Sequence, residues 1–99
     1  MNQMLPIADC ADRLKLLADE TRLSVIRQLL KGPRHVGEIN ESLGLEPSLL
    51  SHHLKILREA GLVQSQRDGK AVLYQLSPEV KAKPGGEGIN LGCCLLSFE

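Results

Sequence analysis

Residues 46–62, EPSLLSHHLKILREAGL, constrain the fold most, because this stretch predicts one helix with both ends marked. Glu46 stands at the cap position and Pro47 at the first helical residue, where its missing N–H costs nothing. Gly61 can adopt the left-handed conformation that ends a helix. Apolar residues at helical spacing predict a buried stripe. The stripe consists of Leu49, Leu50, Leu54, Ile56 and Leu57.

The opposite face of this helix offers small hydroxyls, an imidazole and a cation at Ser48, Ser51, His52 and Lys55. Such side chains can bond to base edges or to phosphates, and a short helix can enter the major groove of DNA. The face therefore predicts a helix that reads DNA. The plainer alternative is a helix of an ordinary bundle whose polar face is solvated.

Three further helices are predicted upstream, each with its own start or stop signal. They are residues 4–17, beginning near Pro6; a helix capped by Asp19 and ended by Gly32 and Pro33; and Val36–Leu43, closed by Gly44. A turn of about three residues containing a glycine joins the last of them to the reading helix, which is the helix-turn-helix arrangement. The apolar residues of the first helix lie on more than one face, which favours packing on a partner subunit.

After residue 61 the apolar residues alternate, which predicts strands over 62–67 and Ala71–Leu76. Between the strands, Asp68-Gly69 is a turn dipeptide that suits the twist of a hairpin, and Arg67 and Lys70 flank it. A basic hairpin after a reading helix is typical of a wing on a phosphate backbone; taken alone it is a solvated hairpin. The predicted fold class is mainly α with a small β-hairpin, a winged helix-turn-helix (α-α-α-α-β-β) with a docking C-terminal tail.

Composition limits these interpretations. Ninety-nine residues make one domain. Twelve Lys and Arg against twelve Asp and Glu give zero net charge, an objection to nucleic-acid binding. Residues 46–74 hold four cations and three carboxylates, a net charge of only +1. No nucleophile–base set, phosphate loop or carboxylate pair indicates an enzyme. No membrane-length apolar run or signal segment is present, so we expect a soluble cytoplasmic protein.

The end of the chain changes character after Pro78, which ends the last predicted strand. Residues 81–88, KAKPGGEG, break regular structure, and residues 89–99, INLGCCLLSFE, are apolar again. Such a tail is expected to dock on the domain, on a second subunit, or over a ligand. We therefore divide the chain into a winged helix-turn-helix domain for DNA binding and dimerisation (1–80) and a cysteine-containing tail (81–99).

The chain has three cysteines, Cys10, Cys93 and Cys94, an odd number with no secretion signal. This favours thiol chemistry with a metal or an oxidant over a disulfide framework. Soft thiolates suit thiophilic ions, and As(III) or Sb(III) takes two or three thiolates in a pyramid. Two alternatives stay open. The cysteines can be small buried hydrophobes, or they can oxidise to a disulfide or polysulfide link that changes DNA affinity.

Three stretches in this order resemble the ArsR/SmtB (arsenic-repressor) family of bacterial winged-helix regulators. They are LADETRLSVIRQLL at 17–30, INESLGLEPSLLSHHLKILREAGLV at 39–63 and RDGKAVLYQL at 67–76. The resemblance implies a homodimeric repressor that sits on an inverted-repeat operator in double-stranded DNA and leaves it when an inducer binds. It implies no cofactor for DNA binding, and it places the first and last elements at the dimer interface. A winged helix that binds only other proteins is the remaining alternative, supported by the neutral charge.

By position, the resemblance implies DNA contacts on the reading helix and the wing. The predicted contacts are Ser48, Ser51, His52, His53, Lys55, Arg67 and Lys70. His53 can equally pack and bond inside the domain.

The resemblance also limits the number of places where an inducer could bind. The Cys-x-Cys of some metal sensors corresponds to residues 35–37, which hold no thiol, so His35 is predicted to be a cap or surface residue. The zinc site on a long last helix corresponds to 81–88, which has no histidine. Some arsenic-sensing relatives carry adjacent cysteines near the C-terminus. This implies an inducer site at Cys93 and Cys94, with Cys10 as a third ligand from the same or the other subunit.

Overall fold

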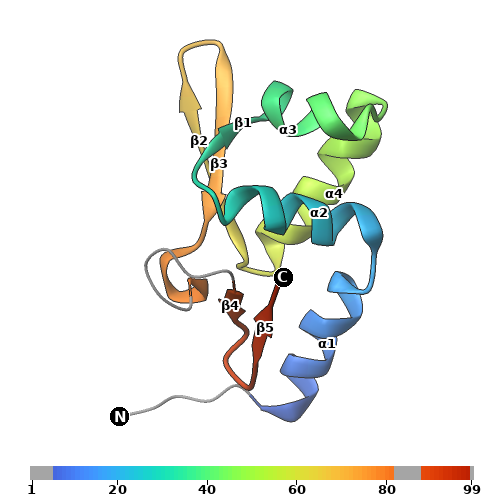
Figure 1. Cartoon of the computed structure of the whole chain (residues 1–99), viewed down its shortest axis with the longest axis vertical. Coiled ribbons are helices and arrows are strands. Elements are labelled where there is room, and N and C mark those ends of the chain that lie inside the picture. The colour runs from blue at the N-terminus through green and yellow to red at the C-terminus, as the bar shows by residue number, and fades with distance from the viewer. Residues whose placement is uncertain (1–5, 82–87, 99) are drawn as a thin grey trace.

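A computed structural model describes residues 6–81 and 88–98 of the chain. Three of the four helices pack against a small sheet whose long hairpin projects at one end of the molecule, while a second, short hairpin lies beside the first helix, α1 (Figure 1). The elements are α1 (Ile7–Leu17), α2 (Glu20–Leu29), β1 (Arg34–His35), α3 (Val36–Leu43), α4 (Pro47–Glu59), β2 (Val63–Asp68), β3 (Ala71–Leu76), the 3₁₀ turn η1 (Pro78–Val80), β4 (Gly88–Asn90) and β5 (Leu95–Ser97). This is the predicted winged helix-turn-helix. None of the described helices has the length and apolar character needed to cross a membrane.

The starts of the first two helices are those the sequence predicted. Pro6 is the N-terminal cap of α1, and residues 4 and 5 of the predicted helix lie outside the described residues. The Asp19 carboxylate caps α2 by accepting a hydrogen bond from the Arg22 backbone N–H at 2.9 Å. This bond stabilises the charged form and lowers the pKa of Asp19 below its ordinary value.

The helix-turn-helix is formed by α3 and α4 with a turn of three residues, as predicted. Gly44 takes the left-handed conformation (φ 62°) that closes α3. The Asn40 side chain fixes the turn, because its amide nitrogen donates to the Leu45 carbonyl and its oxygen accepts from the Leu45 N–H, both at 2.9 Å. This pair of hydrogen bonds was not predicted from the sequence.

The buried stripe of α4 is narrower than predicted. Leu50, Leu54 and Leu57 are each 1% exposed or less. Ile56 is half-buried, but Leu49 is 45% exposed, so its assignment to the buried stripe was wrong. Leu49 lies on the flank of the first turn, where no other described element covers it.

The wing is formed by β2 and β3, which pair antiparallel. Asp68 pairs with Ala71, so the two-residue loop is Gly69-Lys70, and the predicted Asp68-Gly69 turn was wrong by one residue. Gly69 has a φ of 64° and Lys70 does not have a positive φ, which is the pattern of a type II′ turn. A third strand, β1, was not predicted; it pairs with β3 to give the order β1-β3-β2.

The tail docks on its own domain as an antiparallel hairpin of β4 and β5. Ile89 and Leu91 are fully buried, in the same core as the inward side chains of α2 and α4. Residues 82–87, most of the predicted irregular stretch, lie outside the described residues. Of the three predicted docking places, the structure therefore has the first.

His35 ties the wing tip to α3. It is the N-terminal cap of α3, and its backbone N–H donates to Glu38 Oε1 at 2.7 Å. Its ring nitrogens face two carboxylates, with Nε2 at 2.7 Å from Asp68 Oδ2 and Nδ1 at 3.1 Å from Glu38 Oε1. The bond to Asp68, and then that to Glu38, raise the pKa of His35 above 6.5. The prediction of a cap was confirmed, but its link to the wing was not foreseen.

Burial on α4 gives a first testable prediction. Leu54→Ala removes a fully buried side chain and should lower the free energy of unfolding by about 2–5 kcal/mol. Leu49→Ala removes the same atoms from an exposed position on the same helix and should change it by less than about 1 kcal/mol. Urea unfolding followed by circular dichroism measures both. Equal losses would contradict the burial described here.

The His35 clamp gives a prediction about pH. Because the folded pKa is raised, the stabilisation is complete below the ordinary value of 6.5 and is lost as the pH rises through the folded pKa. The difference in melting temperature between the wild type and His35→Gln should therefore be larger near pH 6 than near pH 8. His52→Gln, an exposed histidine on α4, is the matched control and should show no such trend. A His35→Gln difference that does not change with pH would rule out the charged clamp.

Candidate DNA-binding face and thiol site

The first turns of α4 present an exposed polar face. Ser48, Ser51, His52 and Lys55 are all exposed, on the side of the helix opposite the buried leucines. Glu46 makes no side-chain capping bond, so the N–H groups of the first turn have no partner from the cap. Free N–H groups and the positive end of the helix dipole suit a phosphate. This end of α4 can therefore bind an anionic backbone and offer hydroxyl and imidazole groups to bases.

The two adjacent histidines of α4 have different surroundings. His52 is exposed, whereas His53 is half-buried and its Nδ1 lies 3.0 Å from Arg22 Nη1. A guanidinium can only donate, so Nδ1 is the acceptor and the ring proton sits on Nε2. The bond to α2 is compatible with a structural role for His53, one of the two roles that the sequence left open.

Arg22 also binds α1, because its Nε donates to the Leu16 carbonyl. Its Nη2 lies 3.9 Å from Asp19 Oδ2. Arg22 thus links the end of α1 and the cap of α2 to α4, the second helix of the helix-turn-helix, called the recognition helix below. Sequence reasoning missed this residue. The available signal was its position in the first turn of a helix, where the dipole disfavours a cation unless it has specific partners.

The wing tip carries the other predicted DNA contacts. Arg67 and Lys70 are both exposed, at the end of β2 and in the loop that follows it. Asp68 lies between them, and its bond to His35 offsets the charge that would otherwise repel a phosphate. The hairpin projects from the body of the domain at the end where α3 lies (Figure 1).

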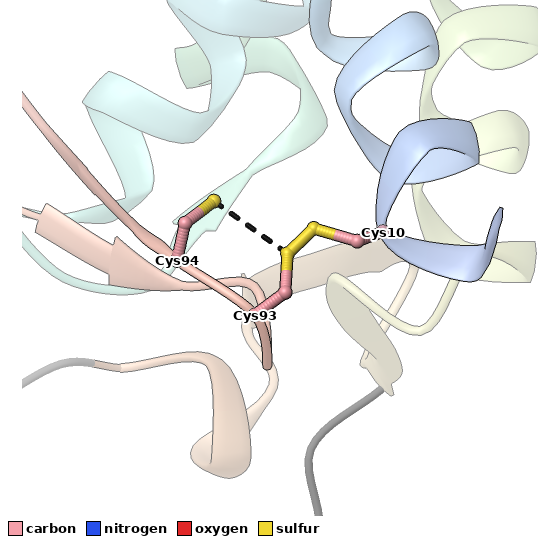
Figure 2. A group of neighbouring side chains, drawn as sticks. All are labelled: Cys10, Cys93 and Cys94. Atoms are coloured by element: carbon pink, nitrogen blue, oxygen red, sulfur yellow. Dashed lines mark hydrogen bonds between the residues drawn. A yellow bond between two sulfur atoms is a disulfide. The ribbon is translucent and has the colours of Figure 1, made fainter. Parts of the chain in front are cut away.

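The three cysteines meet within one subunit. Cys10 on α1 is 5% exposed, while Cys93 is half-buried and Cys94 exposed in the turn between β4 and β5. Their sulfur atoms all lie within 4.8 Å of one another, and among the described residues this is the group suited to a metal ion. Cys10 and Cys93 form a disulfide with a Cα–Cα distance of 6.1 Å, and Cys94 Sγ lies 3.7 Å from Cys93 Sγ (Figure 2). Within one chain, Cys10 thus reaches the cysteine pair, which is compatible with the first of the two predicted arrangements.

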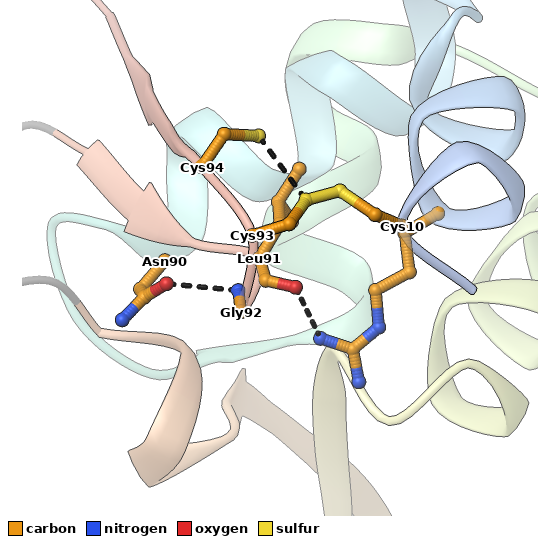
Figure 3. Close-up of a disulfide and its surroundings, with 7 residues drawn as sticks. Cys10, Asn90, Leu91, Gly92, Cys93 and Cys94 are labelled. Atoms are coloured by element: carbon orange, nitrogen blue, oxygen red, sulfur yellow. Dashed lines mark hydrogen bonds between the residues drawn. A yellow bond between two sulfur atoms is a disulfide. The ribbon is translucent and has the colours of Figure 1, made fainter. Parts of the chain in front are cut away.

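Backbone contacts hold the turn that presents the cysteine pair. The Leu91 N–H donates to the Cys94 carbonyl at 2.9 Å, and the Gly92 N–H donates to Asn90 Oδ1 at 2.8 Å. Gly92 has a φ of 95°, a conformation that a side chain would oppose. The Leu91 carbonyl accepts from Arg13 Nη1 on α1 at 3.3 Å (Figure 3). These contacts aim both sulfur atoms at α1.

Three soft donors so close together can bind one thiophilic ion, or two of them can join and leave Cys94 as the remaining free thiol. The site is thus chemically distinct from the candidate DNA-binding face. Helix α1 binds the cysteine turn through Arg13, and its Leu16 carbonyl accepts from Arg22, which in turn lies against His53 on α4.

Comparison with known proteins agrees with this geometry. Residues 19–65 match the model of a family described as bacterial regulatory protein, arsR family. The chain is 41% identical to the transcriptional regulator NmtR of Mycobacterium tuberculosis, over 70% of this chain and 58% of that protein. It is 44% identical to the transcriptional activator HlyU of Vibrio cholerae, over 70% of this chain and 65% of that protein. The chain thus spans less than two thirds of the length of these relatives.

Solved structures are similar as well. Reduced HlyU from Vibrio cholerae superimposes with a TM-score of 0.68 at 40% identity, over 71% of this chain and 74% of that one. A homodimeric winged helix-turn-helix DNA-binding domain from Mycobacterium bovis gives a TM-score of 0.63 at 30% identity, over 74% of this chain and 65% of that one. The relatives are transcriptional regulators and not enzymes. By sequence and by fold, this chain belongs to the ArsR family of bacterial transcriptional regulators.

Proposed function

We propose that this chain is a cytoplasmic, homodimeric repressor that binds an inverted-repeat operator and releases it when As(III) or Sb(III) binds to Cys10, Cys93 and Cys94. The observation that carries the proposal is the convergence of the three sulfur atoms within 4.8 Å in one subunit. The site lies on α1 and the tail hairpin, the first and last elements, which the family resemblance places at the dimer interface, so a change there would reach both subunits.

DNA binding is assigned to the exposed end of α4 and to the wing. Ser48, Ser51 and His52 contact bases or phosphates in the major groove, and Lys55 contacts the flanking backbone. Arg67 and Lys70 bind phosphate from the wing tip. His53 holds α4 through Arg22 and supports the face from behind. The zero net charge is compatible with this role, because three exposed cations, Lys55, Arg67 and Lys70, lie on the proposed contact surface.

The dimer is assigned to α1 and the tail hairpin. Ile7 and Leu14 on α1 are 81% and 44% exposed, and Leu95 on β5 is 66% exposed. Exposed large apolar side chains on these two elements favour an interface. The related domain from Mycobacterium bovis is described as homodimeric, which supports two copies here. Two copies of α4 can then face successive major grooves on one side of the duplex.

The inducer chemistry requires reduced thiols. Arsenous acid condenses with three thiols: three As–O bonds break, three As–S bonds form, and three waters leave with the thiol protons, while arsenic stays trivalent. A disulfide between Cys10 and Cys93 removes two of the donors. It must first be reduced by two equivalents of a cellular thiol, which becomes a disulfide in turn. Cys94, exposed at the surface, is the first thiol the inducer meets.

A second candidate function is a thiol-redox sensor on the same fold. The observation that favours it is the disulfide between Cys10 and Cys93, which joins α1 to the tail hairpin. An oxidant such as a disulfide or a peroxide takes two electrons from the two thiols and is itself reduced to thiols or water. The structure of HlyU in a form described as reduced is compatible with thiol chemistry in a relative.

The two candidates predict different responses. Fluorescence anisotropy on labelled upstream DNA should show arsenite weakening binding of reduced protein by about 5–150-fold, the usual range of allosteric coupling. Zinc should have no comparable effect. Release by a mild oxidant alone, reversed by a reductant, would instead favour the redox sensor. No binding to any upstream fragment would favour a protein-interaction module and reject both.

Two cysteine variants separate the candidates at the residue level. Cys94→Ser removes one arsenic ligand but leaves Cys10 and Cys93 free to oxidise. It should weaken the response to arsenite by about tenfold or more, equivalent to about 1.4 kcal/mol, and keep any response to oxidant. Cys10→Ser should also weaken the response to arsenite, and it should abolish any response to oxidant that depends on the disulfide between Cys10 and Cys93. A Cys94→Ser variant with a full arsenite response would remove that residue from the site.

The wing gives a prediction about DNA affinity. Lys70→Ala should weaken binding to all sequences alike and reduce the slope of log affinity against log salt by about 1, because one phosphate contact is lost. Lys81→Ala is the matched control, since Lys81 is an exposed lysine after the other end of β3. Equal slopes for Lys70→Ala and the wild type would show that the wing tip does not contact DNA.

A further inference from the structure

Arg13 contacts the turn that carries the cysteine pair. It lies three residues after Cys10 on α1, so the two side chains share one face of the helix. Its Nη1 donates to the Leu91 carbonyl at 3.3 Å, and the same Leu91 peptide donates its N–H to the Cys94 carbonyl at 2.9 Å (Figure 3). Leu91 is fully buried. Any movement of the cysteine turn relative to α1 therefore moves the acceptor of Arg13.

The same guanidinium lies beside the end of the recognition helix. A Cβ placed on Gly61 would stand 3.6 Å from Arg13 Nη2. Gly61 has a φ of 77°, and its N–H donates to the Arg58 carbonyl at 3.0 Å, where α4 ends and the chain turns into β2. Arg13 thus lies between the thiol site and the point from which both the recognition helix and the wing extend.

Acidic side chains share a groove with Arg13. The groove between α1 and the last turns of α4 is lined by Asp9, Asp12 and Glu59 together with Arg13. These carboxylates favour a cation in the groove, and a neutral side chain of similar length would lose both this attraction and the bond to Leu91.

We propose that Arg13 is the positioning residue that couples the thiol site to the DNA-binding face; this rests on the function proposed above. With Cys10 bridged to the cysteine turn, as by the disulfide, the Leu91 carbonyl lies within reach of Arg13, whose guanidinium also lies beside Gly61. Arsenic would bridge the same sulfur atoms. Without a bridge the cysteine turn is free to shift, the bond to Leu91 is released, and the guanidinium beside Gly61 changes position. The orientation of α4 and the wing changes, and DNA must weaken inducer binding by the same factor.

The test compares Arg13→Gln and Arg13→Lys with Lys15→Gln, which removes an exposed cation from the same helix. The dissociation constant for upstream DNA is measured with and without arsenite on protein reduced by a phosphine, since thiol reductants compete for arsenic. Arsenite binding is measured separately by titration. Arg13→Gln should bind arsenite within about threefold of the wild-type affinity, and in the absence of arsenite it should bind DNA within the same range. The ratio of its DNA dissociation constants with and without arsenite should fall below about three, under the usual range of coupling.

Lys15→Gln should keep the wild-type ratio, and Arg13→Lys should keep part of it, because an ammonium retains the charge but lacks the planar fork. An Arg13→Gln variant that binds arsenite and retains the wild-type ratio would overturn the proposal. If arsenite leaves the DNA dissociation constant of the wild type unchanged, the metalloid inducer is rejected instead. The same variants, measured in the oxidised and the reduced form, then test the coupling with the disulfide as the bridge. If oxidation also leaves the DNA dissociation constant of the wild type unchanged, the coupling is rejected.

Hydrogen exchange provides a second measurement that needs no variant. Arsenite should change the exchange rates of the Gly61 and Leu62 amides, which donate to Arg58 and Leu57 at the end of α4. Unchanged rates at both amides in protein that binds arsenite would overturn the proposal even if Arg13→Gln does not fold.

Discussion

Leu50, Leu54 and Leu57 hold the recognition helix α4 on the domain, each with 1% or less of its surface exposed, against α2 and the start of β2. Burying a leucine contributes about 1.5–3 kcal/mol, so the three together are comparable to the whole stability of a small domain, about 5–15 kcal/mol. An α-helix makes one turn every 3.6 residues, so the burial of these leucines also determines which residues face outward. The serines and His52 are exposed because the leucines are buried. The packing that makes the domain stable therefore also orients the surface assigned to DNA.

Two arginines connect α1 to the rest of the domain by donating to backbone carbonyls. Arg22 reaches back from α2 to Leu16 and across to His53 on α4, while Arg13 reaches from α1 to Leu91 in the cysteine turn. Hydrogen bonds from a charged donor contribute about 1.5–3 kcal/mol, more than neutral ones. The helix that carries Cys10 is thus held both to the thiol site and to the recognition helix. This gives a short, contiguous route between the two sites, made of directional contacts that a small displacement can break.

Local signals were sufficient for the helix-turn-helix but not for contacts distant in sequence. The bounds of α3 and α4 follow from Gly44 and Pro47, which act on neighbouring residues alone. The strand β1 has two residues and exists only because β3 lies beside it. The strand β2 extends to Asp68, whose carboxylate binds His35, so the wing turn lies one residue later than the sequence predicted. The bond from Arg13 to Leu91 spans 78 residues, and no periodicity encodes such a pair. The sequence indicated Cys10 as a candidate third ligand but could not show whether it would act in its own subunit or in the partner.

A thiol site closed within one chain has consequences that a site shared across a dimer would not have. On the function proposed above, each chain would hold its own set of three sulfur ligands and would need no residue of a partner to bind the inducer. The disulfide between Cys10 and Cys93 adds a second condition, because it consumes two of the three ligands. The site can therefore bind a thiophilic ion with all three sulfur atoms only while Cys10 and Cys93 are reduced. The same three residues thus make ion binding depend on the redox state of their surroundings.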